Sequence, residues 1–261
     1  MITARVPDIL ARIVSVKQQA LPVLRERASV LERLAADNLS EHRDFAASLK
    51  NTPAIIAEVK KASPSRGLLA HDFSPVRTAQ QYQQGGAAAI SVLTDEEFFQ
   101  GSLADLEAAR AACHLPVLRK DFTIDPLHII EAAAHGADAI LLIAAILDST
   151  EMRTLRELAE SLGMAALVEV HTADELQATI DSGARIIGVN NRDLHTFNVR
   201  LELSLELAQS IPSEATRVAE SGIFTAADVR RLGDAGYQAF LVGEALMKSS
   251  DPAEALRSLR G

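Results

Sequence analysis

Cysteine is nearly absent from this 261-residue sequence, which contains only Cys113. A single thiol cannot form an intramolecular disulfide, and this predicts a protein of a reducing compartment. The first residues lack a basic segment followed by a long apolar core, so we expect no signal peptide. The longest apolar run, residues 139–147, is far too short to cross a bilayer. These absences predict a cytoplasmic protein that does not enter a membrane.

Net positive charge is also missing. The formal net charge is −9 at pH 7, although 23% of the residues are charged. A polyanion needs a basic surface, so nucleic acid is not an expected partner. A small anionic ligand remains compatible with this charge, because a local cluster of donors can hold it. Hydrophobic residues make up 48% of the chain, which is typical of a folded globular protein.

Several motifs of known chemistry do not occur. The sequence has no G-x-G-x-x-G and no P-loop, which argues against a nucleotide-binding doubly wound sheet. It has no H-E-x-x-H, and its seven histidines are scattered, so we expect no metal site. It has no G-x-S-x-G, which argues against a serine hydrolase. Any chemistry must therefore come from residues dispersed along the chain.

One pattern repeats along the chain: a helical segment ends near a glycine, and an apolar strand starts shortly afterwards. The repeats begin at Gly85, Gly136, Gly163, Gly183 and Gly236. Two further strands begin near residues 116 and 216, and another begins near residue 54, so about eight strands alternate with helices. We predict an α/β fold, a closed (βα)8 TIM barrel that forms a single domain over residues 1–261. A doubly wound open sheet is the alternative.

Residues 1–50 precede the first strand and are predicted to form a helical extension of the barrel. Apolar residues recur there at helical spacing and indicate two amphipathic helices. They are Ile9, Ile13, Val16, Val30, Leu31, Leu34, Leu39, Phe45 and Leu49. We expect the extension to cap the core across one barrel mouth, and we favour this over a direct role in a site.

Charged residues occur where the predicted strands end. They are Glu58, Lys60, Lys120, Glu169 and Arg192, with Asn190 and Asn191 beside the last of them. Carboxyl ends of barrel strands carry active sites, and an unpaired buried charge is costly. A ring of purely stabilising ion pairs is the alternative, but these groups exceed what barrel closure needs, so we favour acid–base chemistry. His171 shares a face with Glu169, and we interpret it as a hydrogen-bonding neighbour rather than a catalytic group.

Two glycines follow the last two predicted strands. Gly222 and Gly243 would let backbone N–H groups approach an anion, at the usual phosphate position of this barrel. We therefore predict a phosphate site. Phe98, Phe99 and Phe122 flank the ends of the second and third strands, which suggests an apolar slot for a ring, although plain packing explains the pattern equally well.

Eight segments together resemble the indole-3-glycerol phosphate synthase family of tryptophan biosynthesis. They cover residues 55–67, 91–102, 118–122, 136–147, 167–171, 187–194, 218–223 and 240–247. Single pieces such as "AESGI" recur in other phosphate-binding barrels, but the combination is specific and spans nearly the whole chain, including the extension. The resemblance implies cyclisation of 1-(2-carboxyphenylamino)-1-deoxyribulose 5-phosphate to indole-3-glycerol phosphate, with loss of carbon dioxide and water. It also implies that no metal or organic cofactor takes part.

The resemblance further implies roles for residues at matching positions. Lys120 would be the general acid, and Glu169 its proton-transfer partner in dehydration. Lys60 would hold the substrate carboxylate or assist proton transfer, with Glu58 orienting it. The remaining positions are Asn190 and Ser221, which would fix the reacting groups; Ser63 and Arg192, which would contact substrate; Phe99, Phe122 and Leu141, which would wall the aromatic ring; and Gly222, Gly243 and the backbone of Glu244, which would cradle phosphate.

Two other functions stay open on the residues alone. A phosphoribosyl-anthranilate-type isomerase would use a Cys or Asp pair early and late in the chain, but Cys113 lies in the wrong place, before the third strand. A non-catalytic sensor of a phosphorylated ligand would keep Gly222 and Gly243 but would not need both Lys120 and Glu169. In each case the partner is a small phosphorylated molecule. The oligomeric state is left open, with a monomer as the working expectation and a transient pathway partner allowed.

Overall fold

Eight parallel strands form a closed barrel in the computed structural model, which describes residues 8–63, 67–68 and 73–261. Around the barrel the strands run β1–β10–β9–β8–β7–β6–β5–β4. Their bounds are β1 Ala54–Val59, β4 Ala89–Leu93, β5 Val117–Lys120, β6 Ala139–Ile143, β7 Ala165–Val170, β8 Ile186–Asn190, β9 Thr216–Glu220 and β10 Ala239–Val242. A short antiparallel pair, β2 (Ala62–Ser63) and β3 (Gly67–Leu68), follows β1. The predicted (βα)8 barrel is confirmed, and the open sheet is excluded.

The first strand closes the barrel because it pairs on both sides. Ile56 lies opposite Ala89 of β4, and Ala54 lies opposite Ala239 of β10. All six residues of β1 are buried. A barrel strand is buried on both faces, by the barrel interior on one side and by helices on the other, so its successive residues are nearly all apolar. This explains the continuous apolar segments in the sequence.

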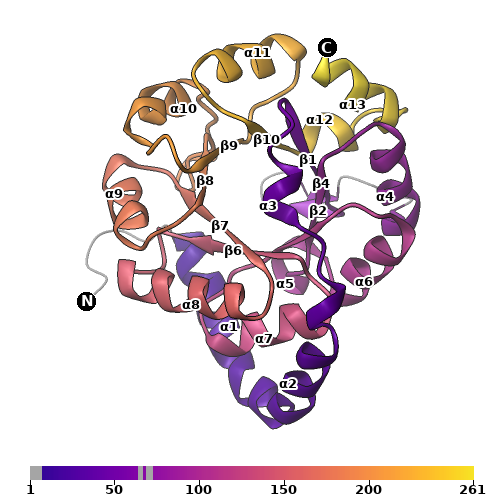
Figure 1. Cartoon of the computed structure of the whole chain (residues 1–261), viewed down its shortest axis with the longest axis vertical. Coiled ribbons are helices and arrows are strands. Elements are labelled where there is room, and N and C mark those ends of the chain that lie inside the picture. Colours follow the sequence, from indigo (N-terminus) through magenta and orange to yellow (C-terminus); the bar gives the residue numbers. More distant parts are fainter. Residues whose placement is uncertain (1–7, 64–66, 69–72) are drawn as a thin grey trace.

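Helices alternate with the strands and surround the barrel (Figure 1). They are α4 Pro75–Gln84, α5 Glu96–Phe99, α6 Leu103–Ala112, α7 Pro126–Ala134, α8 Ser149–Ser161, α9 Ala173–Asp181, α10 Glu202–Leu207, η2 Ala208–Ser210, α11 Ala226–Asp234, α12 Glu244–Met247 and α13 Pro252–Arg260. The predicted left-handed glycines after helices are found, except that Gly86 (φ +82°) takes this conformation in place of Gly85.

The extension reaches both ends of the barrel, and not one mouth as expected. Its elements are α1 Asp8–Glu26, α2 Ala28–Asp37, η1 Leu39–Glu41 and α3 Phe45–Ser48. Figure 1 shows α3 across the centre of the ring, while α2 projects below it. The side chains of α3 meet the amino-terminal ends of β7 and β8, and those of α1 reach the carboxyl ends of the strands. In α2, Leu31 is buried, but Val30 and Leu34 are exposed, so the predicted apolar face is only partly covered.

A buried carboxylate fastens the extension to the amino-terminal end of the barrel. Asp138 accepts hydrogen bonds from the backbone N–H groups of Arg43 (2.7 Å) and Val117 (2.8 Å), and the guanidinium of Arg110 contacts it at 2.5 Å. Three donors satisfy most of the acceptor capacity of this carboxylate, which makes its burial tolerable.

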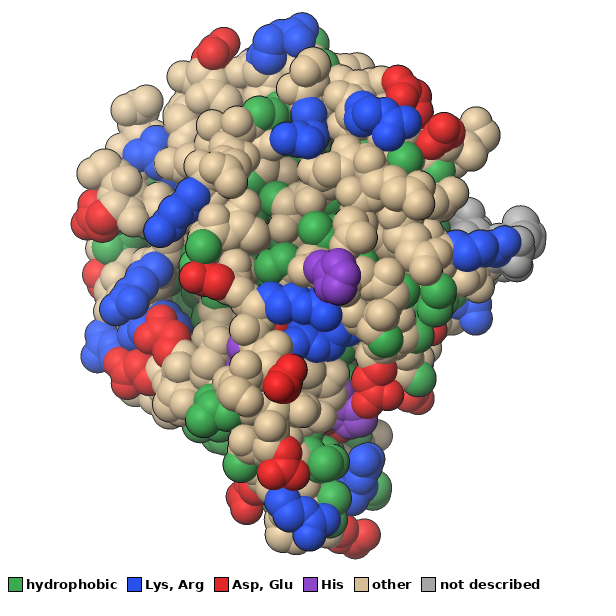
Figure 2. Space-filling model, turned by 45° about the vertical axis from the view of Figure 1, so that its right-hand side comes forward, with side chains coloured by type: hydrophobic (Ala, Val, Ile, Leu, Met, Phe, Trp, Pro, Cys, Tyr) green, Lys and Arg blue, Asp and Glu red, His purple; other side chains and the backbone are tan. Residues whose placement is uncertain are grey.

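The surface carries charges of both signs, and none of the described helices could span a bilayer. On the face drawn in Figure 2, Lys and Arg side chains are interspersed with Asp and Glu. Among the described residues, no helix is both long enough and apolar enough to span a bilayer.

Candidate active site

Two adjoining cavities lie at the carboxyl ends of the strands. The larger, about 130 Å³, is called here the aromatic compartment. Its apolar wall consists of Ile9, Leu10, Ile13, Leu93, Phe99, Phe122, Leu141, Ile143, Leu194 and Phe197. The smaller, about 70 Å³, is called the glycine compartment, and its lining includes Gly222, Gly243 and Glu244. Both cavities are lined by Glu58, Lys60, Lys120, Asn190, Arg192 and Ser221. The structure therefore gathers the predicted site residues at one end of the barrel; the side chain of Ser63 lies outside the described residues.

Lys120 occupies the centre of the charged groups. It is the last residue of β5, and its ammonium lies 3.1 Å from Glu169 and 3.7 Å from Glu220. Burial alone would lower the pKa of Lys120, but the charges of Glu169, Glu220 and Glu58 outweigh burial and raise this pKa above its usual range. Lys120 is therefore held as an ammonium group at neutral pH.

The two carboxylates beside Lys120 are driven to opposite protonation states. Burial raises the pKa of Glu169, but Lys120, His171 and Asn190 outweigh it and hold this pKa well below the usual range. Burial and the charge of Glu169 raise the pKa of Glu220 to about 8. Two neighbouring buried carboxylates cannot both carry charge cheaply, so one retains a proton. At neutral pH the pair holds an ionised Glu169 and a protonated Glu220.

Glu220 has no role in the sequence analysis, although it ends β9 as Lys120 ends β5. It is buried, and its Oε1 atom has no hydrogen-bond partner among the described residues. Room for this side chain comes from Gly188 on β8, where a Cβ atom would overlap the Glu220 carboxylate. Its position at a strand end was a usable signal; its proximity to Glu169 was not visible in the sequence.

Glu58 and Lys60 form an ion pair, as expected for residues two apart on one face of a strand. Burial raises the pKa of Glu58, but Lys60 and Lys120 outweigh burial and lower it. The carboxylate packs on Gly243, where a Cβ atom would overlap it. Gly243 is thus required by this contact as well as by any approach of an anion.

Asn190 connects Glu169 to the loop after β8. Its Nδ2 donates to Glu169 Oε1 (3.1 Å), and its Oδ1 accepts from the backbone N–H of Arg192 (3.0 Å). The Arg192 guanidinium contacts the carbonyl of Phe197 (3.3 Å) and the carboxylate of Glu244 (3.4 Å). Arg192 is therefore directed towards the glycine compartment.

The turn after β9 has two successive residues with positive φ. Ser221 has φ +64° and Gly222 has φ +79°. A positive φ is uncommon for a residue with a side chain, and such conformations concentrate at functional sites. The side chain of Asn191, for which the sequence analysis has no role, donates to the carbonyls of Glu220 (3.0 Å) and Ser221 (3.2 Å) and holds the turn. Successive N–H groups in such a turn form a concavity suited to an anion.

Lys17 of α1 ties the extension to the aromatic wall. Its ammonium lies 3.0 Å from Asp95 and 2.5 Å from Asp121. Asp95 caps α5 through the N–H of Phe98, and Asp121 accepts the N–H of Phe122. The rings of Phe99 and Phe122 lie 6.0 Å apart, centroid to centroid. The extension thus lines the aromatic compartment directly. Helical periodicity predicts capping of the core but does not show what a helix packs against, so this role was not visible in the sequence.

We expect Lys17→Met to loosen this wall. The change leaves Asp95 without its cation, whereas Asp121 keeps Arg119 at 3.2 Å. Removing one partner of a buried ion pair costs about 3 kcal/mol of folding free energy. KM for an aromatic substrate should rise about tenfold, more than kcat falls, because the change disturbs positioning and not the charged centre. Steady-state kinetics and urea unfolding measure both effects. Arg231→Gln is the control, since it breaks an exposed pair with Glu202 and should change little. An unchanged KM in Lys17→Met would show that the ion pairs of Lys17 do not shape the aromatic compartment.

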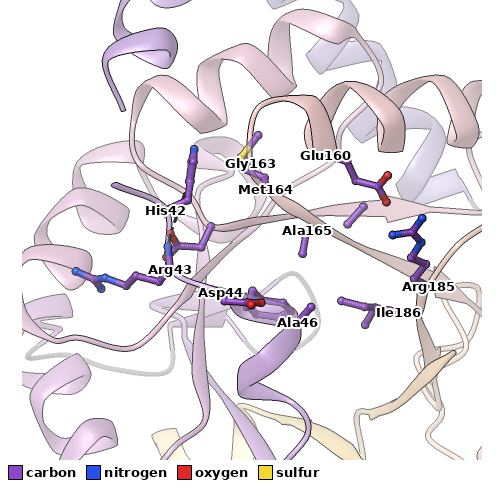
Figure 3. A pocket seen from close by; sticks show the side chains of 13 residues that line it. His42, Arg43, Asp44, Ala46, Glu160, Gly163, Met164, Ala165, Arg185 and Ile186 are labelled. Carbon is purple, nitrogen blue, oxygen red and sulfur yellow. Dashed lines mark hydrogen bonds and ion pairs between the residues drawn. The ribbon is translucent and has the colours of Figure 1, made fainter. Parts of the chain in front are cut away.

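A larger cavity, about 390 Å³, lies at the opposite, amino-terminal end of the barrel (Figure 3). Figure 3 shows His42 and Arg43 on one side of it, with Glu160 and Arg185 on the other. Its carboxylates have structural partners, as Asp138 does and as Glu160 does with Arg156 (2.8 Å). None of the predicted site residues lines it. The ionisable groups with strongly opposed pKa values lie at the carboxyl end, so we place the site there.

The fold and site define a (βα)8-barrel enzyme whose buried ionisable side chains meet at the carboxyl ends of the strands. A sequence model of indole-3-glycerol phosphate synthase matches residues 10–259. The chain belongs to the indole-3-glycerol phosphate synthase family. In the described part of the chain, no three His, Cys, Asp or Glu side chains are grouped so as to hold a metal ion.

Known proteins resemble the chain in sequence or in fold. The indole-3-glycerol phosphate synthases of Aromatoleum aromaticum and Albidiferax ferrireducens are each 49% identical, covering 97% of this chain and 99% and 98% of their own. Among solved structures, a thiamine phosphate pyrophosphorylase from Pyrococcus furiosus matches with TM-score 0.62 and 18% identity, over 81% of this chain and 96% of its own. A 3-hexulose-6-phosphate synthase matches with TM-score 0.62 and 16% identity, over 79% and 98%. These two structures share the barrel.

Proposed function

We propose that the chain carries out its family's reaction, ring closure of 1-(2-carboxyphenylamino)-1-deoxyribulose 5-phosphate to indole-3-glycerol phosphate, at the carboxyl end of the barrel. One observation carries the proposal: an apolar compartment and a glycine-lined compartment are joined by two ammonium groups and several carboxylates. The substrate has the same layout, with an aromatic ring at one end, a phosphate at the other and a ketone between them. The ring would lie between Phe99 and Phe122, and the phosphate at Gly222 and Gly243.

Lys120 acts as the general acid in ring closure. The ring carbon that bears the carboxylate attacks the ketone carbon, and the ketone oxygen takes a proton from the Lys120 ammonium. The carbon–carboxylate bond then breaks, its electrons restore the aromatic ring, and carbon dioxide leaves. The new hydroxyl then leaves as water: an acid protonates it, a base takes a proton from the adjacent carbon that bears the nitrogen, and the electron pair of that C–H bond forms the double bond of the new ring. Glu220, protonated at neutral pH, is the acid, and Glu169 is the base, in agreement with their opposed pKa values.

The cations hold the two ends of the substrate. Lys60, paired with Glu58, faces the substrate carboxylate or assists proton transfer, and Asn190 and Ser221 fix the reacting groups. Arg192 contacts the glycine compartment, where the turn at Ser221 and Gly222 and the backbone at Glu244 would surround phosphate. This local positive field explains how an acidic protein binds a dianionic end group.

Product formation tests the proposal directly. The chain has no tryptophan, so the fluorescence of an indole product would not be masked by the protein. The purified protein and the substrate should yield one fluorescent product and one carbon dioxide per turnover, without added metal. A sensor of phosphorylated ligands would bind the substrate and release no carbon dioxide, and that result would overturn the proposal.

Turnover should fall on the alkaline side of neutrality. Glu220 has its pKa raised to about 8, so its proton is present below that pH and is lost as the pH rises through it. We therefore expect the pH profile of kcat to have an alkaline limb, in which kcat decreases tenfold per pH unit above about pH 8. A profile of kcat from pH 6 to pH 10 measures it. Glu220→Gln should be slow at every pH and should lack the limb; a wild-type limb that persists in Glu220→Gln would assign it to another group.

A further inference from the structure

His171 lies directly behind Glu169, outside both compartments. It follows β7, its side chain is 11% exposed, and its Nε2 lies 3.2 Å from Glu169 Oε1. The other oxygen, Oε2, faces the Lys120 ammonium. His171 does not line either the aromatic or the glycine compartment. It can therefore act on the reaction only through Glu169.

Glu175 holds the imidazole from its other side. Glu175 Oε2 lies 3.2 Å from His171 Nδ1 and accepts the backbone N–H of His171 at 2.6 Å. Glu175 stands in the first turn of α9, where Thr172 caps the helix by accepting the N–H of Glu175. Glu175 is within hydrogen-bond distance of Nδ1, whereas Nε2 faces Glu169 at ion-pair distance without the alignment of a hydrogen bond. Negative charge against both ring nitrogens favours an imidazolium.

Other charged groups face His171 across a cavity of about 490 Å³ that it lines. On the segment after β8 these are Arg192, Asp193, His195 and Arg200. Arg192 and Arg200 have their own partners, Glu244 and Glu206, and Asp193 accepts N–H groups of its own loop. From β9, Glu220 stands beyond Glu169. The two carboxylates in contact with the ring dominate: burial lowers the pKa of His171, but they outweigh it and raise this pKa to about 10.

We propose that His171, clamped by Glu175, is a positioning residue that assigns the single proton of the Glu169–Glu220 pair to Glu220. The inference rests on the proposed function, in which Glu169 must be a base and Glu220 an acid. The imidazolium beside Glu169 favours a negative charge there. Glu220 has Lys120 at 3.7 Å but no ion pair with His171. Lys120 lies closer to Glu169 (3.1 Å) than to Glu220 (3.7 Å), and Asn190 donates to Glu169. The imidazolium adds a second cation on the side of Glu169.

His171→Gln tests the charge, because Gln retains an N–H donor near the Nε2 position without a positive charge. The pair should then bind its proton more tightly, moving the alkaline limb of kcat up by about one pH unit. Near pH 7, kcat should fall about tenfold, which is less than the loss of about a hundredfold or more expected when a general acid or base is removed. KM should change by no more than about twofold. Glu175→Gln should shift the limb in the same direction by a smaller amount. A uniform loss of kcat with an unmoved limb would overturn the proposal and leave His171 a structural residue.

Glu151→Gln is the matched control. Glu151 also stands in the first turn of its helix, α8, and accepts a backbone N–H, that of Asp148 (2.8 Å), but it is not in the site. It should reproduce any loss of helix stability and leave the pH profile unchanged.

Nitrogen-15 NMR of histidine-labelled wild-type protein keeps the proposal testable should the variants not fold. Both His171 ring nitrogens should remain protonated at pH 8, and a neutral His171 ring at pH 7 would overturn the proposal. This measurement needs no turnover. A protein that forms no indole product would therefore fail the proposed function, whatever state the His171 ring is in.

Discussion

Lys120→Met is expected to lower kcat by at least about a hundredfold while the barrel stays folded, because a positioned general acid contributes on this scale. Methionine has a similar length and packs in the same space, but it cannot protonate the ketone oxygen. The change also removes the cation that lies between Glu169 and Glu220 at 3.1 and 3.7 Å. Both carboxylates should then have higher pKa values, so the base would be lost together with the acid.

Lys120→Arg separates the charge of this side chain from its proton. Arginine keeps the positive charge beside Glu169, but it does not deprotonate in proteins. If Lys120 donates a proton, Lys120→Arg should be nearly as slow as Lys120→Met, with a melting temperature closer to that of the wild type. Near-normal turnover in Lys120→Met would remove Lys120 from the mechanism. Equal turnover in Lys120→Arg and wild type would leave it an electrostatic role only.

Glu169→Gln should block a late step more than substrate binding. The amide keeps the size of the side chain, and its oxygen can still accept the hydrogen bond from Asn190, so KM should change little. Without a base, dehydration of the hydroxyl intermediate should slow by about a hundredfold or more. Ring closure and decarboxylation use Lys120 and should be affected less. In a single turnover, carbon dioxide should appear before indole fluorescence, whereas both appear together in the wild type.

Two outcomes would contradict this assignment. Unchanged single-turnover rates in Glu169→Gln would exclude Glu169 as the base. A large rise in KM with a normal kcat would make it a binding residue. Because the pKa of Glu169 lies well below the usual range, loss of the base should slow turnover already at pH 6. Removing its charge also lowers the pKa of Glu220, so the defect should grow towards pH 9 as Glu220 loses its proton. A defect confined to alkaline pH would instead identify the altered group as Glu220.

The barrel and much of the site were predictable because their signals are local. Parallel strands buried on both faces appear as apolar runs, and parallel alignment brings their carboxyl ends to one side. Lys120 and Glu169 are 49 residues apart in the chain, yet each can be placed at a strand end from its own neighbours. The spacing of Glu58 and Lys60 likewise predicts a shared face. The resemblance to the family then supplied roles that position alone does not.

The groups that sequence reasoning missed act through distant partners. Lys17 reads as one polar residue on an amphipathic helix, and only packing shows that it lies against Asp95 and Asp121. Glu220 lies in a recognised segment, but its raised pKa depends on burial and on Glu169 from another strand. His171 was interpreted as a hydrogen-bonding neighbour of Glu169; its Nε2 lies 3.2 Å from Glu169 Oε1, but the two are not aligned as a hydrogen bond. Its second partner, Glu175, comes from the following helix.

The order of chemical groups around the barrel follows from the sequence itself, since strand polarity and side-chain alternation are properties of short stretches. What only the tertiary structure decided is which carboxylate carries the proton and what covers the aromatic compartment. Both depend on burial and on distances of a few ångströms between residues from different strands and helices. A sequence places Glu169 and Glu220 at the same rim, but only burial and the positions of Lys120 and His171 give the two carboxylates opposite protonation states.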